Sequence, residues 1–512
     1  MKLTRRNALG LIAAAPLASR LRAAAANLEI AKGPFAGTRE SLAAYRVPEW
    51  FRDAKFGIWA HWGPQSAPED GDWYARNMYI EGSPQYKYHL EHYGHPSKFG
   101  FKDVIPTWKG DQFDPDHLLD LYKKAGAKYF VSMGVHHDNF DLWNSKHTRW
   151  NAVNMGPKKD IVGLFRKAAL KHGLKFGVSD HLWISYKWFA VSHGSDKQGP
   201  LAGVAYDGAN PQWADLYHDA DCARFAGPNM GWNDDGIPDS WKRHWFDRIK
   251  DLADHYQPDL LYTDGPLPFE EYGLSQVANL YNLSAARHRG AVEAIYTSKR
   301  PEDCETGTCL LDMERGVADR ILPNPWQTDT CVGNWHYQRG VKYKTPKTVI
   351  DLLVDIVSRN GNLLLNFPLP NSGAPDAEEL KIVAEITSWM AVNSEGIYGT
   401  RPWKIFGEGP GTQVEKKGAF NESGRKSLTA EDVRFTTKRN ALYAFLMGWP
   451  AGSAIVKPLG SASPQAPGKI ANVELLGYKG KLEWSQTEAG LSVTMPSEPP
   501  SQHAVTLKVA LG

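Results

Sequence analysis

The chain has 512 residues, of which 42% are hydrophobic and 23% are charged, and this composition is that of an ordinary globular protein. The length exceeds one average domain but fits one large barrel with a smaller appendage. A formal net charge of +2 gives no argument for nucleic acid or an anionic membrane as a partner. Beyond the N-terminal segment, no run of about 20 apolar residues predicts a membrane span.

Residues 1–26 have the pattern of an export signal. Arg5 and Arg6 lie in a basic region, a mild apolar stretch covers residues 8–18, and small residues at 23–26 offer cleavage sites. The adjacent arginines favour the twin-arginine route, with an ordinary signal peptide as the alternative. We therefore expect an exported protein, periplasmic or extracellular.

The four cysteines form no CxxC pair, so the sequence does not indicate zinc or redox chemistry. Cys304 and Cys309 are five positions apart. They form either a short disulfide in an oxidising compartment or two unpaired buried thiols, and the spacing does not decide between these states.

Eight β-prone segments, most of them separated by helical patterns, follow the lead-in. We expect strands at 56–62, 129–135, 175–179, 259–265, 291–297, 309–313, 329–337 and 362–367. Helices are expected at 115–125, 160–173, 241–256, 346–358 and 376–394. This alternation predicts a (β/α)8-type barrel over residues 27–400, irregular after strands five and six, where helices are weak or missing. Residues 401–512 have short alternating runs among Gly, Pro and Ser, which predict a C-terminal antiparallel β-sandwich.

Most of the expected strands end at a histidine or a carboxylate. The strand-end residues are His61, His136, His137, His181, Asp264, Glu314 with Arg315, and Trp335 with His336. One Asp-Gly is more often a turn, and one histidine is more often a satisfied interior residue. Barrel enzymes draw their catalytic groups from strand ends, so the whole set indicates a function.

Two kinds of chemistry fit this set of residues. The histidines are possible metal ligands, but there is no HExxH pair, and Asp264 would have to share a tight coordination sphere with two of them. We favour a pocket in which neutral imidazoles and Trp faces bind a sugar, while two carboxylates flank a glycosidic bond. We expect neither a metal nor a cofactor.

Several stretches resemble the α-L-fucosidases of glycoside hydrolase family 29. They are WFRDAKFGIWAHWG (50–63), DWYARNMY (72–79), KYFVSMGVHHDNFDLWNS (128–145), PDLLYTDG (258–265), RNGNLLLNFPLPNSG (359–373) and GIYGTRPW (396–403). The resemblance implies a catalytic barrel followed by a β-sandwich, and a retaining mechanism with an Asp nucleophile after strand four. It places that nucleophile at Asp264 and the binders of the fucose hydroxyls at His61, Trp73, His136 and His137.

The sequence departs from the family pattern at two positions. Asp72 stands where the family often has Glu, and His181 stands where many members have a Tyr-rich run. Both are retained as candidate substrate binders. Arg315 and Trp335, at the ends of strands six and seven, are further candidates.

The catalytic acid/base is less well defined by the sequence. Glu314 is favoured because it ends strand six, whereas Glu293 and Glu305 remain alternatives. Glu293 is expected early in strand five, facing the middle of the barrel, and Glu305 is expected in a loop between two cysteines. By the resemblance, Gln327 lies where some relatives carry their acid.

The sequence thus predicts an exported, retaining exo-glycosidase that removes terminal α-L-fucose from a glycan through a covalent glycosyl-enzyme. One alternative is the same barrel acting on another α-linked sugar, motivated by Asp72 and His181. Two more are an inactive carbohydrate-binding protein and a metal-dependent hydrolase. The sequence leaves open the linkage cleaved, the oligomeric state and the role of the C-terminal domain.

Overall fold

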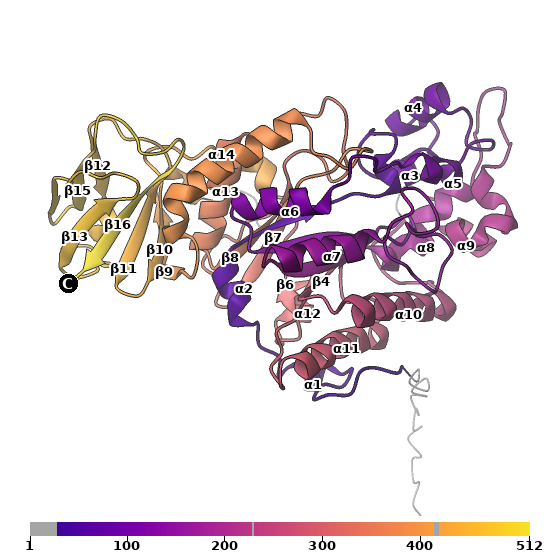
Figure 1. Ribbon diagram of the computed structural model, residues 1–512, viewed down its shortest axis with the longest axis horizontal. Helices are drawn as coiled ribbons and strands as arrows, with labels where there is room; N and C mark the ends of the chain where they lie inside the picture. Colours follow the sequence, from indigo (N-terminus) through magenta and orange to yellow (C-terminus); the bar gives the residue numbers. More distant parts are fainter. Residues whose placement is uncertain (1–27, 228–229, 414–418) are drawn as a thin grey trace, which may run out of the picture.

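The computed structural model describes residues 28–227, 230–413 and 419–512, and the expected export signal lies outside them. The described residues build a barrel with helices around it and a smaller β-domain beside it (Figure 1). None of the helices in these ranges is both long and apolar enough to cross a membrane.

The barrel is a parallel sheet with the strand order β6-β5-β4-β3-β2-β1-β8-β7. A parallel bridge between Asp312 and Gln327 links the two edge strands, so the sheet nearly closes. This confirms the predicted (β/α)8-type barrel. The strands are β1 (Phe56–Ala60), β2 (Tyr129–Val135), β3 (Lys175–Asp180), β4 (Leu260–Thr263), β5 (Ile295–Ser298), β6 (Leu310–Leu311), β7 (Trp326–Cys331) and β8 (Gly361–Asn366).

Almost every residue of the barrel strands is buried, because helices cover the outer face and side chains fill the interior. Alternate residues belong to different cores. Ile58 packs in the large core that includes the helices, whereas Trp59 packs with Leu260 and Tyr262 in a second core. The second core is the barrel interior, and its register decides which residues just beyond each strand point into the site.

The barrel helices begin and end at sequence signals. Asp114 caps α6 by accepting hydrogen bonds from two backbone N–H groups, and Pro115 occupies the first turn. Asp376 forms a capping box with Glu379 at the start of α14. The main helices are α6 (Pro115–Lys124), α7 (Ile161–Lys171), α10 (Asp239–Tyr256), α11 (Glu271–Arg287), α13 (Pro346–Ser358) and α14 (Ala377–Asn393).

The barrel is irregular where the sequence predicted it to be. Only the short α12 (Pro301–Cys304) follows β5, and the described residues between β6 and β7 form no helix. Cys304 and Cys309 are joined by a disulfide within the β5–β6 connection, while Cys222 and Cys331 are buried free thiols. The short connection between β6 and β7 places the residues after these strands close together.

Two strand predictions were displaced. The strand expected at 291–297 is β5 at 295–298, because the residues before it complete the turn after α11, where Gly290 has a positive φ of 95°. The strand expected at 329–337 is β7 at 326–331, and the chain then turns into a loop. The long connection at 80–112 contains α4 (Pro84–His92) and α5 (Phe101–Val104).

The C-terminal domain contains two antiparallel sheets, ordered β13-β16-β11-β10-β9 and β12-β15-β14, around a core of its own. It therefore has the predicted antiparallel β architecture. The strands are β9 (Arg401–Glu408), β10 (Val433–Lys438), β11 (Ala441–Leu446), β12 (Ser453–Val456), β13 (Ile470–Leu475), β14 (Trp484–Gln486), β15 (Leu491–Thr494) and β16 (Val505–Leu511).

A buried charge cluster joins the two domains. Asp355 on α13 accepts hydrogen bonds from Arg359, the residue just after this helix, and from Arg425 and Arg434 of the β-domain. Burial opposes ionisation of Asp355, but the three guanidinium groups outweigh it and hold its pKa well below the usual range. The cluster therefore fixes the β-domain against α13.

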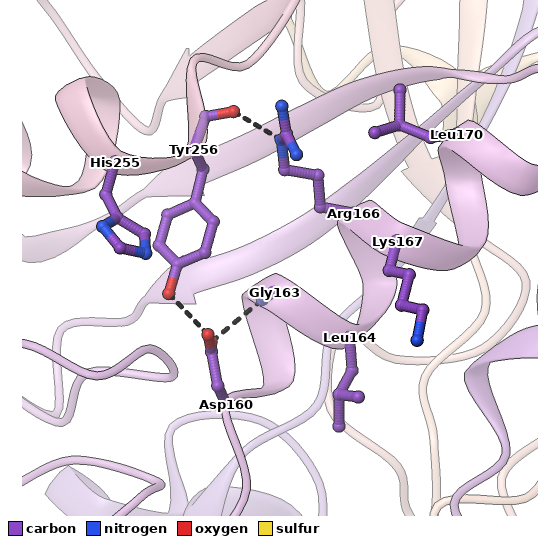
Figure 2. A pocket seen from close by; sticks show the side chains of 8 residues that line it. All are labelled: Asp160, Gly163, Leu164, Arg166, Lys167, Leu170, His255 and Tyr256. Atoms are coloured by element: carbon purple, nitrogen blue, oxygen red, sulfur yellow. Dashed lines mark hydrogen bonds between the residues drawn. The ribbon is translucent and has the colours of Figure 1, made fainter.

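A hollow of about 450 Å³ lies in the outer helical layer, between α7 and the end of α10 (Figure 2). Tyr256 donates a hydrogen bond to Asp160 over 2.8 Å, and Arg166 donates to the Tyr256 carbonyl over 2.7 Å (Figure 2). These contacts hold the two helices together. The strand-end residues singled out from the sequence are not among those that line this hollow.

Candidate active site

Asp264 lies directly after β4, at the carboxyl end of the barrel. Its position continues the alternation that directs Leu260 and Tyr262 into the interior. Its backbone N–H donates a hydrogen bond to the Asp180 carbonyl over 3.0 Å, which keeps the chain aligned with β3 past the strand end. The carboxylate therefore stands where barrel enzymes place their catalytic groups.

Three basic side chains surround the Asp264 carboxylate. His137 Nε2 and His181 Nδ1 lie 3.4 and 3.3 Å from its Oδ2, and Lys299 Nζ lies 3.8 Å from its Oδ1. Burial alone would favour the protonated acid. The two histidine contacts and the charge of Lys299 outweigh that effect and hold the pKa of Asp264 well below its usual range. Asp264 is therefore an ionised carboxylate, as a nucleophile must be.

Lys299, the residue after β5, connects the acids of the site. Besides Asp264, its Nζ contacts Glu314 Oε2 at 3.1 Å, Asp329 Oδ2 at 3.1 Å and Asp312 Oδ1 at 3.4 Å. Burial lowers the pKa of Lys299, but these four acidic neighbours outweigh it and raise that pKa well above the usual value. None of these three residues, Lys299, Asp312 and Asp329, was predicted from the sequence as part of the site.

Glu314 is the second carboxylate of the site. Burial raises its pKa to about 7, with Lys299 opposing this shift and the charges of Asp329 and Asp264 adding to it. A carboxyl group of this pKa can give a proton and take it back near neutral pH. Because Lys299 contacts both acids, the nearest carboxylate oxygens of Asp264 and Glu314 lie no more than about 7 Å apart.

The two alternative acids lie elsewhere. Glu293 precedes β5, at the amino end of that strand, so the expectation that it faces the middle of the barrel was wrong. Its carbonyl accepts a hydrogen bond from the Trp50 indole over 2.8 Å. Glu305 is exposed just after α12. Of the three candidate acids, Glu314 is the one whose carboxylate contacts Lys299, which also contacts Asp264.

Gln327 and Asp329 on β7 form a polar layer below the two carboxylates. Gln327 accepts a hydrogen bond from the Tyr129 hydroxyl over 2.9 Å and donates to Asp312 over 2.6 Å. Asp329 accepts from the Tyr262 hydroxyl over 2.7 Å. Burial and the Asp329 charge raise the pKa of Asp312 well above its usual value, which shifts Asp312 toward its protonated form. This layer supports Lys299 from inside the barrel.

Five buried histidines form one cluster beside Asp264. Ring-centroid distances are 4.4 Å for His136–His137, 4.7 Å for His136–His181, 4.8 Å for His136–His336 and 5.4 Å for His61–His181. Burial and neighbouring histidines lower the pKa of His61 and His136 well below the usual value, and burial also lowers that of His181. Neutral imidazoles both donate and accept hydrogen bonds, so this cluster suits sugar hydroxyls.

Hydrogen bonds to groups other than imidazoles fix the orientation of three of these rings. His61 Nδ1 lies 3.0 Å from Asn366 Oδ1 at the end of β8, and His136 Nδ1 lies 2.9 Å from the Gln65 amide nitrogen. His137 Nδ1 donates to the His181 carbonyl over 2.5 Å. Each ring therefore keeps its other nitrogen free to meet a group inside the cluster.

The candidate binders from the loops after β1 and β7 also reach the cluster. Asp72 Oδ1 lies 2.9 Å from His336 Nδ1, and Trp73, with a left-handed φ of 59°, meets His137 edge-on at 6.0 Å. Trp335 lies 5.1 Å from the ring of His61. The loop after β7 therefore supplies Trp335 and His336, although the sequence had placed both within a strand.

Arg315 points elsewhere. It follows Glu314 but has a positive φ of 46°, and its guanidinium faces Glu422 at 3.9 Å. Together with Lys344 and Arg425 it lines a separate cavity of about 670 Å³ between α13 and residues 422–428. None of the contacts described for its side chain joins Arg315 to the histidine cluster.

The same side chains include three overlapping groups whose ligand atoms lie within 4.8 Å of one another, as metal ligands do. These groups are His61, His136 and His181; Asp72, His136 and His336; and His137, His181 and Asp264. They share His136 and His181, so an ion in any of them would occupy groups that face the pocket around Asp264. Metal ligation and sugar binding at this site are therefore competing uses of the same residues.

A parallel barrel with an ionised Asp and a Glu of raised pKa at one end, beside neutral imidazoles and indole rings, has the site of a glycoside hydrolase. Comparison with known proteins identifies the family within this class. Residues 22–395 match the α-L-fucosidase family and residues 426–510 match the α-L-fucosidase C-terminal domain. The chain belongs to the α-L-fucosidase family.

Known relatives and solved structures match nearly the whole length of this chain. The tissue α-L-fucosidase of Homo sapiens is 27% identical over 479 residues, which cover 90% of this chain and 88% of that protein. The tissue α-L-fucosidase of Rattus norvegicus is 26% identical over 490 residues, covering 92% and 91%. The Thermotoga maritima α-fucosidase in complex with fucose superposes with a TM-score of 0.69 at 24% identity, covering 93% of this chain and 100% of that one. This structural similarity shows that the two proteins share a fold.

Proposed function

We propose that this fucosidase is a retaining, exo-acting enzyme that releases terminal α-L-fucose from glycans by double displacement. The observation that carries the proposal is the pair Asp264 and Glu314, held by one ammonium group within about 7 Å of each other. Retaining glycosidases keep their two carboxyl groups about 5–5.5 Å apart, whereas inverting enzymes need more room for a water molecule. An upper limit of about 7 Å includes the spacing of retaining enzymes and excludes most of the inverting range of about 6.5–9.5 Å, so it favours retention.

In the first step Asp264 attacks the anomeric carbon and forms a carbon–oxygen bond as the glycosidic bond breaks. Glu314 gives its proton to the departing oxygen, so the leaving group departs as an alcohol. In the second step the Glu314 carboxylate takes a proton from water, and the hydroxide oxygen displaces Asp264 from the anomeric carbon. Both carboxyl groups then return to their starting protonation states.

The contacts of Lys299 explain how Glu314 changes from acid to base. While Asp264 is ionised, its charge raises the pKa of Glu314. Once Asp264 is esterified that charge is lost, and the ammonium still lies 3.1 Å from Glu314. The pKa of Glu314 therefore falls in the glycosyl-enzyme, which favours the carboxylate that the second step requires.

The histidine cluster defines the sugar site in this proposal. His61, His136, His137 and His181 meet the hydroxyls, and Asp72 and Trp73 close the pocket from the loop after β1. Trp335 offers an apolar face. The substrate is a fucosylated oligosaccharide or glycoconjugate, and no cofactor takes part. Asp72 and His181 depart from the family pattern and therefore motivate one alternative substrate, another α-linked sugar in the same pocket.

The test is turnover of 4-nitrophenyl α-L-fucoside by wild type, Asp264→Ala and Glu314→Ala, each with and without azide. We expect both variants to be slow, and azide to rescue them as glycosyl azides of opposite configuration. Near-normal turnover by Glu314→Ala would remove Glu314 as the acid. Faster wild-type turnover of a non-fucoside nitrophenyl glycoside would move the proposal to the alternative sugar, and loss of activity in EDTA would favour a metal-dependent hydrolase.

We also propose that the protein is exported. The basic and apolar pattern of residues 1–26 and the Cys304–Cys309 disulfide support this proposal. Fusion of the first segment to a reporter that needs the twin-arginine route is the test. Replacement of Arg5 and Arg6 by Lys should abolish export of the reporter, and export by the general secretory route would favour an ordinary signal peptide.

A further inference from the structure

Trp232 is an exposed aromatic side chain at the edge of the active site. It lies in the long insertion between β3 and α10, and 48% of its surface is exposed. Its ring centroid is 5.6 Å from that of His137, 5.8 Å from Trp73 and 6.3 Å from Trp183. Two of these neighbours touch Asp264: His137 contacts its carboxylate at 3.4 Å, and the Trp183 indole donates to its carbonyl over 2.6 Å.

The exposure of Trp232 contrasts with the burial of the two neighbours that touch Asp264. His137 and Trp183 are each 1% exposed, and Trp73 is partly buried. Leaving half of an indole in water forgoes much of the stabilisation that its burial would give. The packing of the folded chain therefore does not account for a Trp at this position.

The faces of the Trp232 ring are not stacked against other rings. Trp73, His137 and Trp183 meet it at interplanar angles of 40°, 65° and 55°, so none of these described neighbours lies parallel to it. The apolar faces of pyranose rings pack on indole faces of this kind. An open indole face at the rim of a sugar site is therefore a surface on which a sugar ring can lie.

The segment that carries Trp232 is tied to the rest of the molecule. Lys187, which is buried on α8 (Ser185–Trp188), donates a hydrogen bond to Asn233 Oδ1 over 2.7 Å. Arg224 donates to the Gly236 carbonyl over 2.5 Å. Arg76 on α3 (Tyr74–Asn77), the helix that follows Trp73, donates a hydrogen bond to the Trp188 carbonyl at the end of α8. The segment with Trp232 and the helix after Trp73 are thus both anchored to α8.

We propose that Trp232 binds the first sugar of the leaving group by stacking against it. This inference rests on the proposed exo-acting function, because the fucose itself is then enclosed by buried groups and the remainder of the glycan extends toward solvent. The half-exposed indole of Trp232, beside the proposed nucleophile, then contacts the part of the glycan that extends toward solvent. Trp232 is thereby a specificity residue for glycans over substrates with small leaving groups.

The experiment compares wild type, Trp232→Ala and Trp232→Phe on two kinds of substrate. One is a set of (1→2)-, (1→3)- and (1→6)-linked α-L-fucosyl oligosaccharides, and the other is α-L-fucosyl fluoride, whose leaving group has no ring. For the preferred glycan we expect Trp232→Ala to lose about tenfold in kcat/KM, mostly through KM, and Trp232→Phe to retain most of it. Turnover of the fluoride should match wild type in both variants.

Tyr478→Ala is the matched control, since Tyr478 is also an exposed aromatic residue (40%) but lies in the β-domain. Melting temperatures of all variants show that they are folded. Equal losses on glycan and fluoride, or no loss on either, would overturn the proposal. Wild type that hydrolyses the fluoride but none of the glycans would also overturn it. Wild type inactive on every fucoside would instead contradict the proposed function.

Discussion

Replacing Lys299 by Met removes the ammonium group that contacts both proposed catalytic carboxyls, Asp264 and Glu314, while keeping a side chain of similar length. The ammonium is 3.1 Å from Glu314 and 3.8 Å from Asp264. At an effective dielectric constant of about 20, a unit charge pair 3.1 Å apart interacts by about 5 kcal/mol, or nearly four pKa units. Since four acids share the charge and water reaches the site, we expect an observed shift of at least about one unit.

The direction of the shift follows from the sign of the lost charge. A positive neighbour favours the ionised form of both acids, so its removal raises the pKa of Asp264 and of Glu314. In the proposed mechanism, ionisation of Asp264 sets the acidic limb of the pH–rate profile. Deprotonation of Glu314, whose pKa is about 7, sets the basic limb. Both limbs should therefore move to higher pH in Lys299→Met.

The assay is kcat/KM against pH for a fucosyl oligosaccharide, whose alcohol leaving group needs the acid. Lys299→Arg keeps the charge and should shift the limbs less than Lys299→Met. Lys124→Met is the matched control, because it removes an exposed lysine that pairs with Asp120 on α6. Limbs that stay in place, or move to lower pH, in Lys299→Met would refute the electrostatic role assigned to Lys299.

Three further predictions concern stability. Replacing Cys304 and Cys309 by Ala should lower the free energy of unfolding by about 2 kcal/mol, as expected for a short disulfide loop, and an unchanged denaturation midpoint would contradict this. Arg248→Met leaves the fully buried Asp141 without its ion pair and should cost about 3–5 kcal/mol in the same measurement, with part of the loss recovered in a double variant with Asp141→Leu. The pKa of Asp355 is lower in the folded protein than in the unfolded chain, where it is about 3.9. Asp355 therefore stabilises the fold at pH values above about 3.9, and this contribution is lost as the pH falls through the folded pKa. Asp355→Asn should therefore lower the melting temperature at neutral pH and flatten its acid dependence, and a dependence as steep as that of wild type would count against the cluster.

The barrel was predictable because its signals are local. The strands at 129–135 and 362–367 are apolar runs bounded by glycine or turn residues, and Asp114 and Asp376 mark helix starts. Strand five was predicted to start too early, at 291, although the Ala and Glu of residues 291–294 are weaker strand formers than the Ile-Tyr-Thr that follows. Pairing with β4, which begins at Leu260 opposite Ile295, decides where that strand starts. Such pairing depends on residues distant in the sequence.

The site was predictable only in part. Histidines and Asp264 at strand ends could be recognised because the strand alternation directs them inward. Lys299 could not, since one lysine after a strand is a common pattern. Its role depends on Asp312 and Asp329, which approach it from β6 and β7. Arg315 was placed in the site by its neighbour Glu314, but the positive φ at Arg315 turns its side chain toward Glu422.

The central claim is that Asp264 forms a covalent bond to fucose while Glu314 serves as acid and base. Its most direct test is to incubate the enzyme with a 2-deoxy-2-fluoro-L-fucosyl fluoride, which slows the second step, and to analyse a proteolytic digest by mass spectrometry. We predict one fluorofucosyl adduct, located on the peptide that contains Asp264. An adduct on another residue, or an unlabelled enzyme that releases fucose of inverted configuration, would contradict it.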